Sequence, residues 1–139
     1  MLERPAHGQC LPVGRRGPTS LDRALLATGF PYVRDGLVDR NTRLVRDFLK
    51  APCHGVRRGG SAAIDLCHTA AGKLDGYWEF RLRAWDTAAG TLIAREAGCR
   101  VTDAQGADVA IPTASVVAAP AGLHEAMLAV IAAEGSTDE

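Results

Sequence analysis

Two stretches of the sequence place a polar side chain where a helix is expected to begin. In RRGGSAAIDLC, a short strand candidate leads through two glycines to Ser61 and then to an apolar helical stripe. The first turn of a helix exposes unpaired backbone N–H groups and the positive end of the helix dipole, which favour an anion or a polar hydroxyl. The same spacing suits simple capping by Ser61, so these residues alone are compatible with either role.

Asp86 is the second candidate, and it directly follows Trp85 at the start of another predicted helix. A carboxylate at that point can cap the helix, because it accepts hydrogen bonds from free N–H groups and complements the dipole. It can also bind a metal cation. The spacing favours the cap, and metal binding is the alternative.

These residues are positioned by alternating strand and helix candidates. Strands are predicted where short apolar runs end at turn residues, namely at 24–28, 55–58, 76–80, 101–102 and 114–118. Helices are predicted where apolar residues recur every three or four positions, namely at 39–50, 62–71, 86–97 and 122–133. The alternation indicates an α/β protein with a mostly parallel sheet covered on both faces, or a layered α/β sandwich.

The apolar residues also predict which side of each helix is buried. For the helix at 62–71, the expected core stripe consists of Ala62, Ala63, Leu66, Cys67, Ala70 and Ala71, and the other face holds Ser61, Asp65 and His68. For the helix at 86–97, the expected buried residues are Ala88, Ala89, Leu92, Ile93 and Ala97.

Length and composition indicate one soluble domain. The chain has 139 residues, of which 47% are hydrophobic and 23% are charged, as in globular proteins. No apolar run reaches the roughly 18–20 residues of a membrane span, and the first residues do not resemble a signal peptide. We expect a cytoplasmic protein without a membrane partner, with an irregular lead-in at 1–18, a domain at 19–135 and a tail at 136–139.

Charge and cysteine content argue against two other classes of function. Residues 1–58 hold eleven Lys or Arg against five acids, and residues 59–139 hold five against eleven. Aromatic residues are sparse among the basic ones, so no nucleic-acid partner is expected. Cys53-His54 and Cys67-His68 suggest zinc, but adjacent residues on a helix point in different directions, and neither pair has the usual ligand spacing. The cysteines show no disulfide pattern.

Three motifs in order provide a more specific indication. GSAAIDLCHTAAGKLDGYWE is followed after four residues by AWDTAAGTLIAREAG and then by VTDAQG. This order closely resembles the second half of the inositol monophosphatase family, which are magnesium-dependent phosphatases of small sugar and polyol phosphates. ATGFPY at 27–32 also resembles bacterial members, and the resemblance covers roughly residues 20–135.

The resemblance implies roles for particular residues. The Asp of the Trp-Asp pair, a ligand of catalytic Mg²⁺ in the family, matches Asp86. The substrate-facing backbone of the family matches Ser61 and Ala62, and its hydroxyl-binding Glu matches Glu79, for which a solvated strand-end acid is the alternative. Arg81 and Arg83 could steer an anionic substrate, although ordinary surface charge is the favoured explanation.

The chain also departs from the family pattern. The Gly-Glu-Glu and Asp-Pro-Ile/Leu-Asp-Gly-Thr motifs of the first half are absent. The resemblance therefore implies an incomplete α/β/α/β/α sandwich, represented by its C-terminal layers: a mixed, mostly parallel sheet flanked by helices. Such a half should expose apolar surface that a neighbouring layer would cover.

The expected function follows from this departure. We expect a fragment of an Mg²⁺-dependent phosphatase of small phosphorylated polyols or sugars, inactive or nearly so by itself, because one carboxylate makes a weak magnesium site. The alternative is a non-catalytic binding or interaction module that needs a complementing chain or forms a homo-oligomer.

Overall fold

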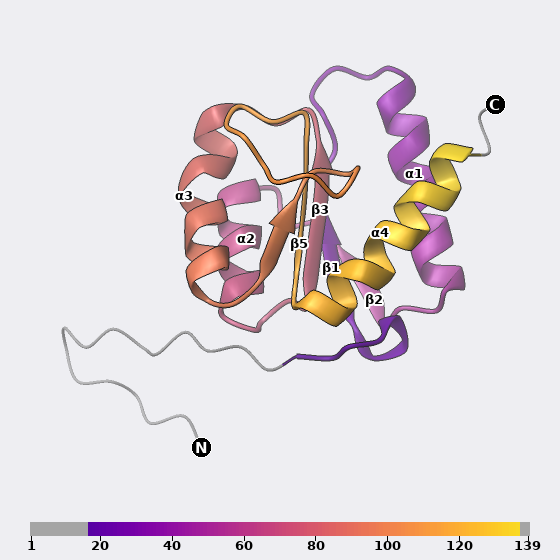
Figure 1. The fold of residues 1–139 in the computed structure, drawn as a ribbon. Helices are drawn as coiled ribbons and strands as arrows, with labels where there is room; N and C mark the ends of the chain where they lie inside the picture. The colour runs from indigo at the N-terminus through magenta and orange to yellow at the C-terminus, as the bar shows by residue number, and fades with distance from the viewer. Residues whose placement is uncertain (1–16, 137–139) are drawn as a thin grey trace.

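The computed structural model describes residues 17–136, which form alternating strands and helices (Figure 1). The strands are β1 (Leu25–Thr28), β2 (Gly55–Arg57), β3 (Gly76–Phe80), β4 (Arg100–Thr102) and β5 (Ser115–Ala119). The helices are α1 (Gly36–Lys50), α2 (Ala62–Ala70), α3 (Ala84–Glu96) and α4 (Ala121–Gly135), preceded by a short 3-10 turn at Leu21–Arg23. Most of the predicted lead-in, residues 1–16, and residues 137–139 of the tail lie outside the described residues.

The strands form one five-stranded mixed sheet in the order β2-β1-β3-β5-β4. Strand β1 pairs in parallel with both β2 and β3, whereas β5 runs antiparallel to β3 and β4. The predicted mixed sheet flanked by helices is confirmed, with two parallel and two antiparallel strand pairs. Because β1, β2 and β3 are parallel, their carboxyl ends meet at the same edge of the sheet.

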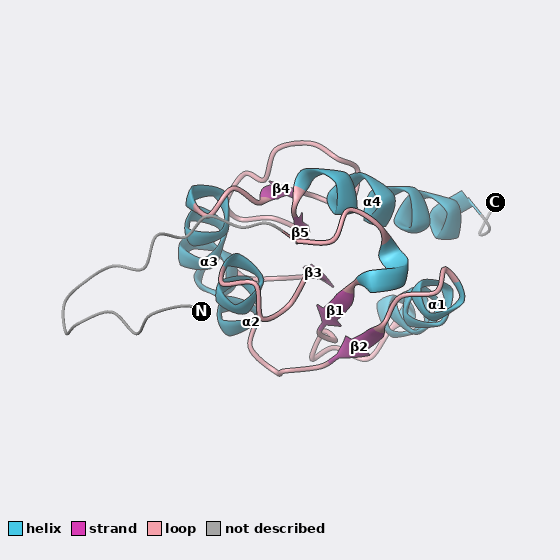
Figure 2. Cartoon of the chain, turned by 90° about the horizontal axis from the view of Figure 1, so that it is seen from below, coloured by secondary structure: helices cyan, strands magenta, loops and turns pink. Residues whose placement is uncertain are grey.

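Two helices cover each face of the sheet, α1 and α4 on one side and α2 and α3 on the other (Figures 1 and 2). The alternation of side chains along a strand divides the core accordingly. Leu26 of β1 and Trp78 of β3 pack under α1 and α4, where the Trp78 and Phe48 rings are 4.5 Å apart. Their neighbours Ala27 and Tyr77 pack under α2 and α3. Each sheet face is therefore a separate hydrophobic cluster.

Helices α1 and α3 begin before their predicted starts. Asp35 caps α1, since its side chain accepts a hydrogen bond from the Leu37 N–H at 3.1 Å, and the helix begins at Gly36 rather than 39. Helix α3 begins at Ala84, two residues before Asp86. In α1 the missed first turn includes Leu37, which packs against the core, whereas in α3 it includes Trp85, which is 76% exposed.

The predicted buried face of α3 is wrong except at Ala97. Leu92 and Ile93 are 60% and 42% exposed, and Ala88 and Ala89 are also exposed. The buried residues within the helix are instead Thr87, Gly90, Thr91 and Ala94.

Close packing of α2 against α3 explains this difference. A Cβ atom on Gly90 would lie 2.7 Å from the Cβ of Leu66 in α2, so the helices meet through small residues. Asp65 of α2, predicted to lie off the core face, is buried at 3% exposure. Of the predicted α2 stripe, Ala71 is instead exposed, and Ala63 and Cys67 are only partly buried. Small and polar residues therefore occupy positions that an apolar pattern assigns to larger side chains.

Part of the exposed apolar surface lies on this helix pair. Ile64 of α2 is 55% exposed, near the exposure of Leu92 and Ile93 on α3. Exposed side chains of this kind suit a layer that packs against another, and that packing stays a prediction. Among residues 17–136, no helix combines the length and apolar character needed to cross a membrane.

Candidate functional site

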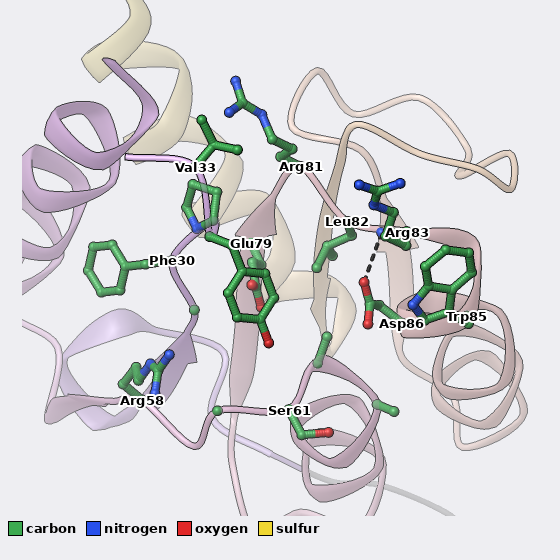
Figure 3. A pocket seen from close by; sticks show the side chains of 16 residues that line it. Phe30, Val33, Arg58, Ser61, Glu79, Arg81, Leu82, Arg83, Trp85 and Asp86 are labelled. Atoms are coloured by element: carbon green, nitrogen blue, oxygen red, sulfur yellow. Dashed lines mark hydrogen bonds between the residues drawn. The ribbon is translucent and has the colours of Figure 1, made fainter. Parts of the chain in front are cut away.

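A pocket of about 720 Å³ opens at the edge of the sheet where β1, β2 and β3 end (Figure 3). All four residues predicted for the site, Ser61, Ala62, Glu79 and Asp86, line this pocket. They come from the start of α2, from β3 and from the first turn of α3. The carboxyl ends of strands in open α/β sheets are where ligands commonly bind, because connecting loops and helix N-termini converge there.

Ser61 is the N-cap of α2, and its hydroxyl accepts a hydrogen bond from the Ile64 N–H at 3.4 Å. Gly60, immediately before it, has a φ of +97°, a left-handed conformation that suits glycine and turns the chain into the helix. The capping role is thus present, and it points the first turn of α2 toward the pocket that Ser61 and Ala62 line.

Asp86 is half-buried in the first turn of α3. Its Oδ2 accepts a hydrogen bond from the Arg83 N–H at 2.9 Å, so the carboxylate stabilises the helix start. No other hydrogen bond from residues 17–136 is made to this carboxylate, which leaves Oδ1 able to contact a ligand. Helix stabilisation and ligand binding are therefore compatible at Asp86.

Glu79 is partly buried at the centre of the pocket wall and is not a fully solvated strand-end acid. Its carboxylate accepts a hydrogen bond from the Tyr77 hydroxyl. Burial raises the pKa of Glu79, and the negative charges of Asp65 and Asp86 raise it further. Glu79 also lies against Gly29, where any Cβ atom would overlap the carboxylate. The carboxylate is held in one place by strand, hydroxyl and glycine together.

The arginines of the pocket differ in their contacts. Arg81 forms an ion pair with Asp35 at 2.7 Å, with both side chains partly exposed. The Arg83 guanidinium lies 5.7 Å from the centre of the Trp85 ring. Arg58 also lines the pocket, although sequence reasoning did not select it.

Sequence reasoning also missed the loop after β1, residues 29–33, which lines the pocket opposite α3. The predicted parallel sheet could have been used to identify both this loop and Arg58, because residues that follow parallel strands lie at one edge. Each follows a strand whose carboxyl end lies at the same edge of the sheet.

The carboxylates of the pocket do not make a complete magnesium site. Glu79 and Asp86 are its acidic lining residues, and residues 17–136 contain no group of three or more His, Cys, Asp or Glu side chains arranged to hold a metal. Magnesium takes about six oxygen ligands in near-octahedral geometry. The described residues can therefore provide one protein ligand of a magnesium site, and they do not provide the complete ligand set.

The zinc alternative has no geometric support either, because the described residues contain no group of three or more potential metal ligands. Cys53 and Cys67 are free thiols, and Cys10 lies outside the described residues. Burial raises the pKa of Cys53, which disfavours its thiolate form.

The fold is that of an α/β protein with a pocket at the carboxyl ends of parallel strands. The sequence model of the inositol monophosphatase family matches residues 4–136. The chain therefore belongs to the inositol monophosphatase family, a family of phosphatase type.

Individual relatives agree with this assignment. A putative Nus factor SuhB of Neisseria meningitidis serogroup B is 44% identical over 113 residues, which are 81% of this chain and 43% of that protein. An inositol-1-monophosphatase of Synechocystis is 40% identical over 122 residues, covering 88% of this chain and 42% of the relative. The solved inositol monophosphatase of Anabaena superposes with a TM-score of 0.81 at 34% identity, covering 88% of this chain and 49% of that one. The chain spans less than half the length of these relatives.

Proposed function

We propose that this chain supplies the polyol-binding half of a magnesium-dependent phosphatase that hydrolyses phosphate monoesters of small polyols or sugars. One observation carries the proposal: residues distant in sequence, from Ser61 to Asp86, line a single pocket. Membership of a phosphatase family supports the reaction class, and the names of two relatives refer to inositol monophosphate.

Each residue has a role that its contacts allow. The fixed Glu79 carboxylate accepts a hydrogen bond from a substrate hydroxyl, while Asp86 Oδ1 provides one oxygen ligand to Mg²⁺. The first turn of α2, at Ser61 and Ala62, offers backbone N–H groups to an oxygen of the substrate. When bound, magnesium would activate water and neutralise charge on the leaving oxygen.

We propose further that the 139-residue chain is catalytically silent, or nearly so, by itself. Metal-assisted phosphate hydrolysis needs several oxygen ligands around one or two cations, and Asp86 supplies one. A half-domain carrying the missing acidic motifs would complete the site, in the same chain or in a complementing one.

The test measures phosphate release from inositol 1-phosphate in Mg²⁺ by the purified chain. We expect no release from the chain alone, and release when the first half of the Synechocystis inositol-1-monophosphatase is joined to its N-terminus. In that fusion Asp86→Asn should lower the rate roughly a hundredfold or more, as loss of a group that stabilises transition-state charge does. Asp108→Asn, at an exposed acid that does not line the pocket, should leave the rate unchanged.

Two results would contradict the proposal. Release by the unfused chain that disappears with Asp86→Asn would show that the chain is not silent. A folded fusion without any magnesium-dependent release would contradict the phosphatase role itself.

A further inference from the structure

We propose that Tyr77 is a positioning residue for Glu79: its hydroxyl holds one oxygen of the carboxylate, so that the other oxygen is a fixed acceptor for a hydroxyl of the ligand. The consequence for the ligand rests on the proposed function, in which Glu79 accepts a hydrogen bond from a substrate hydroxyl. Tyr77 itself does not line the pocket and acts on the ligand only through Glu79.

Strand β3 places the two side chains together. Tyr77 and Glu79 are two positions apart in this strand, and alternate residues of a strand point to the same face of the sheet. Tyr77 is fully buried and belongs to the hydrophobic cluster under α2 and α3. Glu79 is only partly buried and lines the pocket (Figure 3). The strand therefore connects the core of the protein to the pocket wall.

The two oxygens of the Glu79 carboxylate differ in their contacts. Oε2 accepts the hydrogen bond from the Tyr77 hydroxyl. Oε1 has no hydrogen-bond donor among residues 17–136, and it is not one of their fully buried unpaired atoms. The backbone of Gly29 also lies against this carboxylate. One oxygen is thus held within the protein, while the other is accessible to a ligand.

The direction of the hydrogen bond is fixed by the buried tyrosine. Burial raises the pKa of Tyr77 well above its usual value, and the negative charge of Glu79 raises it further, so the hydroxyl keeps its proton and donates. A donor beside a carboxylate favours its ionised form. Burial raises the pKa of Glu79, and the hydrogen bond from Tyr77 opposes that rise. Tyr77 therefore helps to keep Glu79 an acceptor.

Other charged groups near Glu79 restrict what it can bind. Asp65 of α2 and Asp86 of α3 contribute negative charge, and Arg58, after β2, contributes positive charge. Asp65 is 3% exposed, and its Oδ2 has no hydrogen-bond partner in the described part of the chain. An anionic group at Glu79 Oε1 would be repelled by these acids, and a carbonyl has no proton to donate. A hydroxyl meets both conditions.

A purely structural role for Tyr77 is the competing explanation. A buried phenol hydroxyl needs a hydrogen-bond partner, and Glu79 provides one. In that case, removing the hydroxyl would change the stability of the domain and nothing else. Only a positioning role makes both the ionisation of Glu79 and the affinity for the ligand depend on the Tyr77 hydroxyl.

The first test needs neither ligand nor metal. NMR follows the Glu79 carboxyl carbon during a pH titration of the purified 139-residue chain labelled with ¹³C-glutamate, and Glu79→Gln assigns the signal. Tyr77→Phe should raise the pKa of Glu79 by about one pH unit, the effect of losing one hydrogen bond to a charged group. Tyr32→Phe is the matched control, because Tyr32 is 95% exposed and makes no hydrogen bond with Glu79.

A second measurement keeps the sequence intact. Chain produced with 3-fluorotyrosine carries a more acidic phenol, which is a stronger hydrogen-bond donor. The pKa of Glu79 should then fall, opposite to the effect of Tyr77→Phe. Combining the label with Tyr32→Phe attributes this change to Tyr77, because the described residues contain these two tyrosines.

The ligand is tested in the fusion that carries the missing half-domain, at an alkaline pH that keeps Glu79 ionised in every variant. Tyr77→Phe should raise the KM for inositol 1-phosphate about fivefold and leave kcat within about twofold, because a fixed acceptor contributes equally to ground-state and transition-state binding. In a Glu79→Gln background, Tyr77→Phe should cause no further rise, since it acts through Glu79.

The outcomes separate this proposal from the proposed function. An unchanged Glu79 pKa in both Tyr77→Phe and the fluorinated chain would overturn the positioning role, whether or not the fusion is active. A shifted pKa with an unchanged KM would overturn the consequence for the ligand. A folded fusion without activity would contradict the proposed function and the ligand consequence with it, while the titration would still decide the positioning role.

Discussion

At the scale of single residues, the pocket depends on the close approach of Gly29 to Glu79. The backbone carbonyl of Gly29 accepts a hydrogen bond from Asn41 Nδ2 at 2.8 Å, and Asn41 Oδ1 accepts one from the Trp78 indole N–H at 2.7 Å. These buried contacts fix the loop after β1 against the carboxylate. Because the glycine and its partners are held in place, a side chain at residue 29 would have to push the Glu79 carboxylate away from its present position.

Replacing Gly29 by alanine should therefore lower stability. A methyl group would displace the Glu79 carboxylate from its hydrogen bond with the Tyr77 hydroxyl, and loss of one such hydrogen bond costs about 0.5–1.5 kcal/mol. Urea denaturation measures the loss. Gly36→Ala is the control, since nothing lies within 4 Å of its Cβ position, and it should change stability by no more than about 0.5 kcal/mol. Equal stabilities of the two variants would contradict the close approach.

At the scale of elements, α4 is held on the sheet by a buried polar contact as well as by apolar packing. His124 is fully buried, and its Nε2 lies 2.8 Å from Thr102 Oγ1 at the end of β4. Its Nδ1 has no hydrogen-bond partner among residues 17–136. Burial, together with the positive charge of Arg100, lowers the pKa of His124 to about 4. The imidazole is thus neutral in the folded protein at physiological pH.

This pKa predicts how stability depends on pH. The folded value of about 4 lies below the ordinary value of 6.5, so the unfolded chain takes up the proton first as pH falls. The contribution of His124 is therefore fully present above about pH 6.5 and is lost progressively toward pH 4, by roughly 3 kcal/mol in total. Denaturation midpoints between pH 7.5 and 4 measure this loss.

Two variants isolate the histidine from the carboxylates that titrate in the same range. His124→Gln should flatten the pH dependence by about the predicted amount. His54→Gln replaces an exposed histidine and should keep the parental slope. Parallel curves for the parent and His124→Gln would show that His124 does not control the acid sensitivity.

At the scale of the whole molecule, an ion-pair network joins helices from opposite ends of the chain. Glu134 of α4 is 2% exposed and contacts Arg40 Nε at 3.0 Å and Arg43 Nε at 2.8 Å, both on α1. The Arg40 guanidinium also lies 4.7 Å from the centre of the Phe80 ring. The network therefore connects both helices with the end of β3, close to the strand residue that carries the pocket carboxylate.

Glu134→Ala should destabilise the domain by about 2 kcal/mol. Breaking a buried ion pair costs about 3–5 kcal/mol when the remaining charge stays buried, and the two arginines here are partly exposed, so water can solvate them. Thermal unfolding measures the effect. Asp47→Ala breaks the more exposed pair with Arg46 and should cost less than about 1 kcal/mol. A Glu134 variant as mild as this control would contradict the role assigned to the network.

The sequence by itself determined the order and type of the elements, the family, and four residues that meet in one pocket. Those features depend on local properties: apolar periodicity, turn residues, and motifs contained within short stretches around Ser61, Glu79 and Asp86. Helix starts were less predictable, because α1 begins with a glycine and the first turn of α3 exposes Trp85.

Only the tertiary structure decided which face of α3 is buried and which additional residues line the pocket. Gly90 is buried because Leu66 of another helix approaches its backbone closely. The pattern of residues within α3 cannot predict this contact, because it depends on a second helix. Arg58 and the loop after β1 reach the site because parallel pairing brings three strand ends to one edge. Contacts between segments distant in sequence depend on their relative placement, and that placement exists only once the sheet has formed.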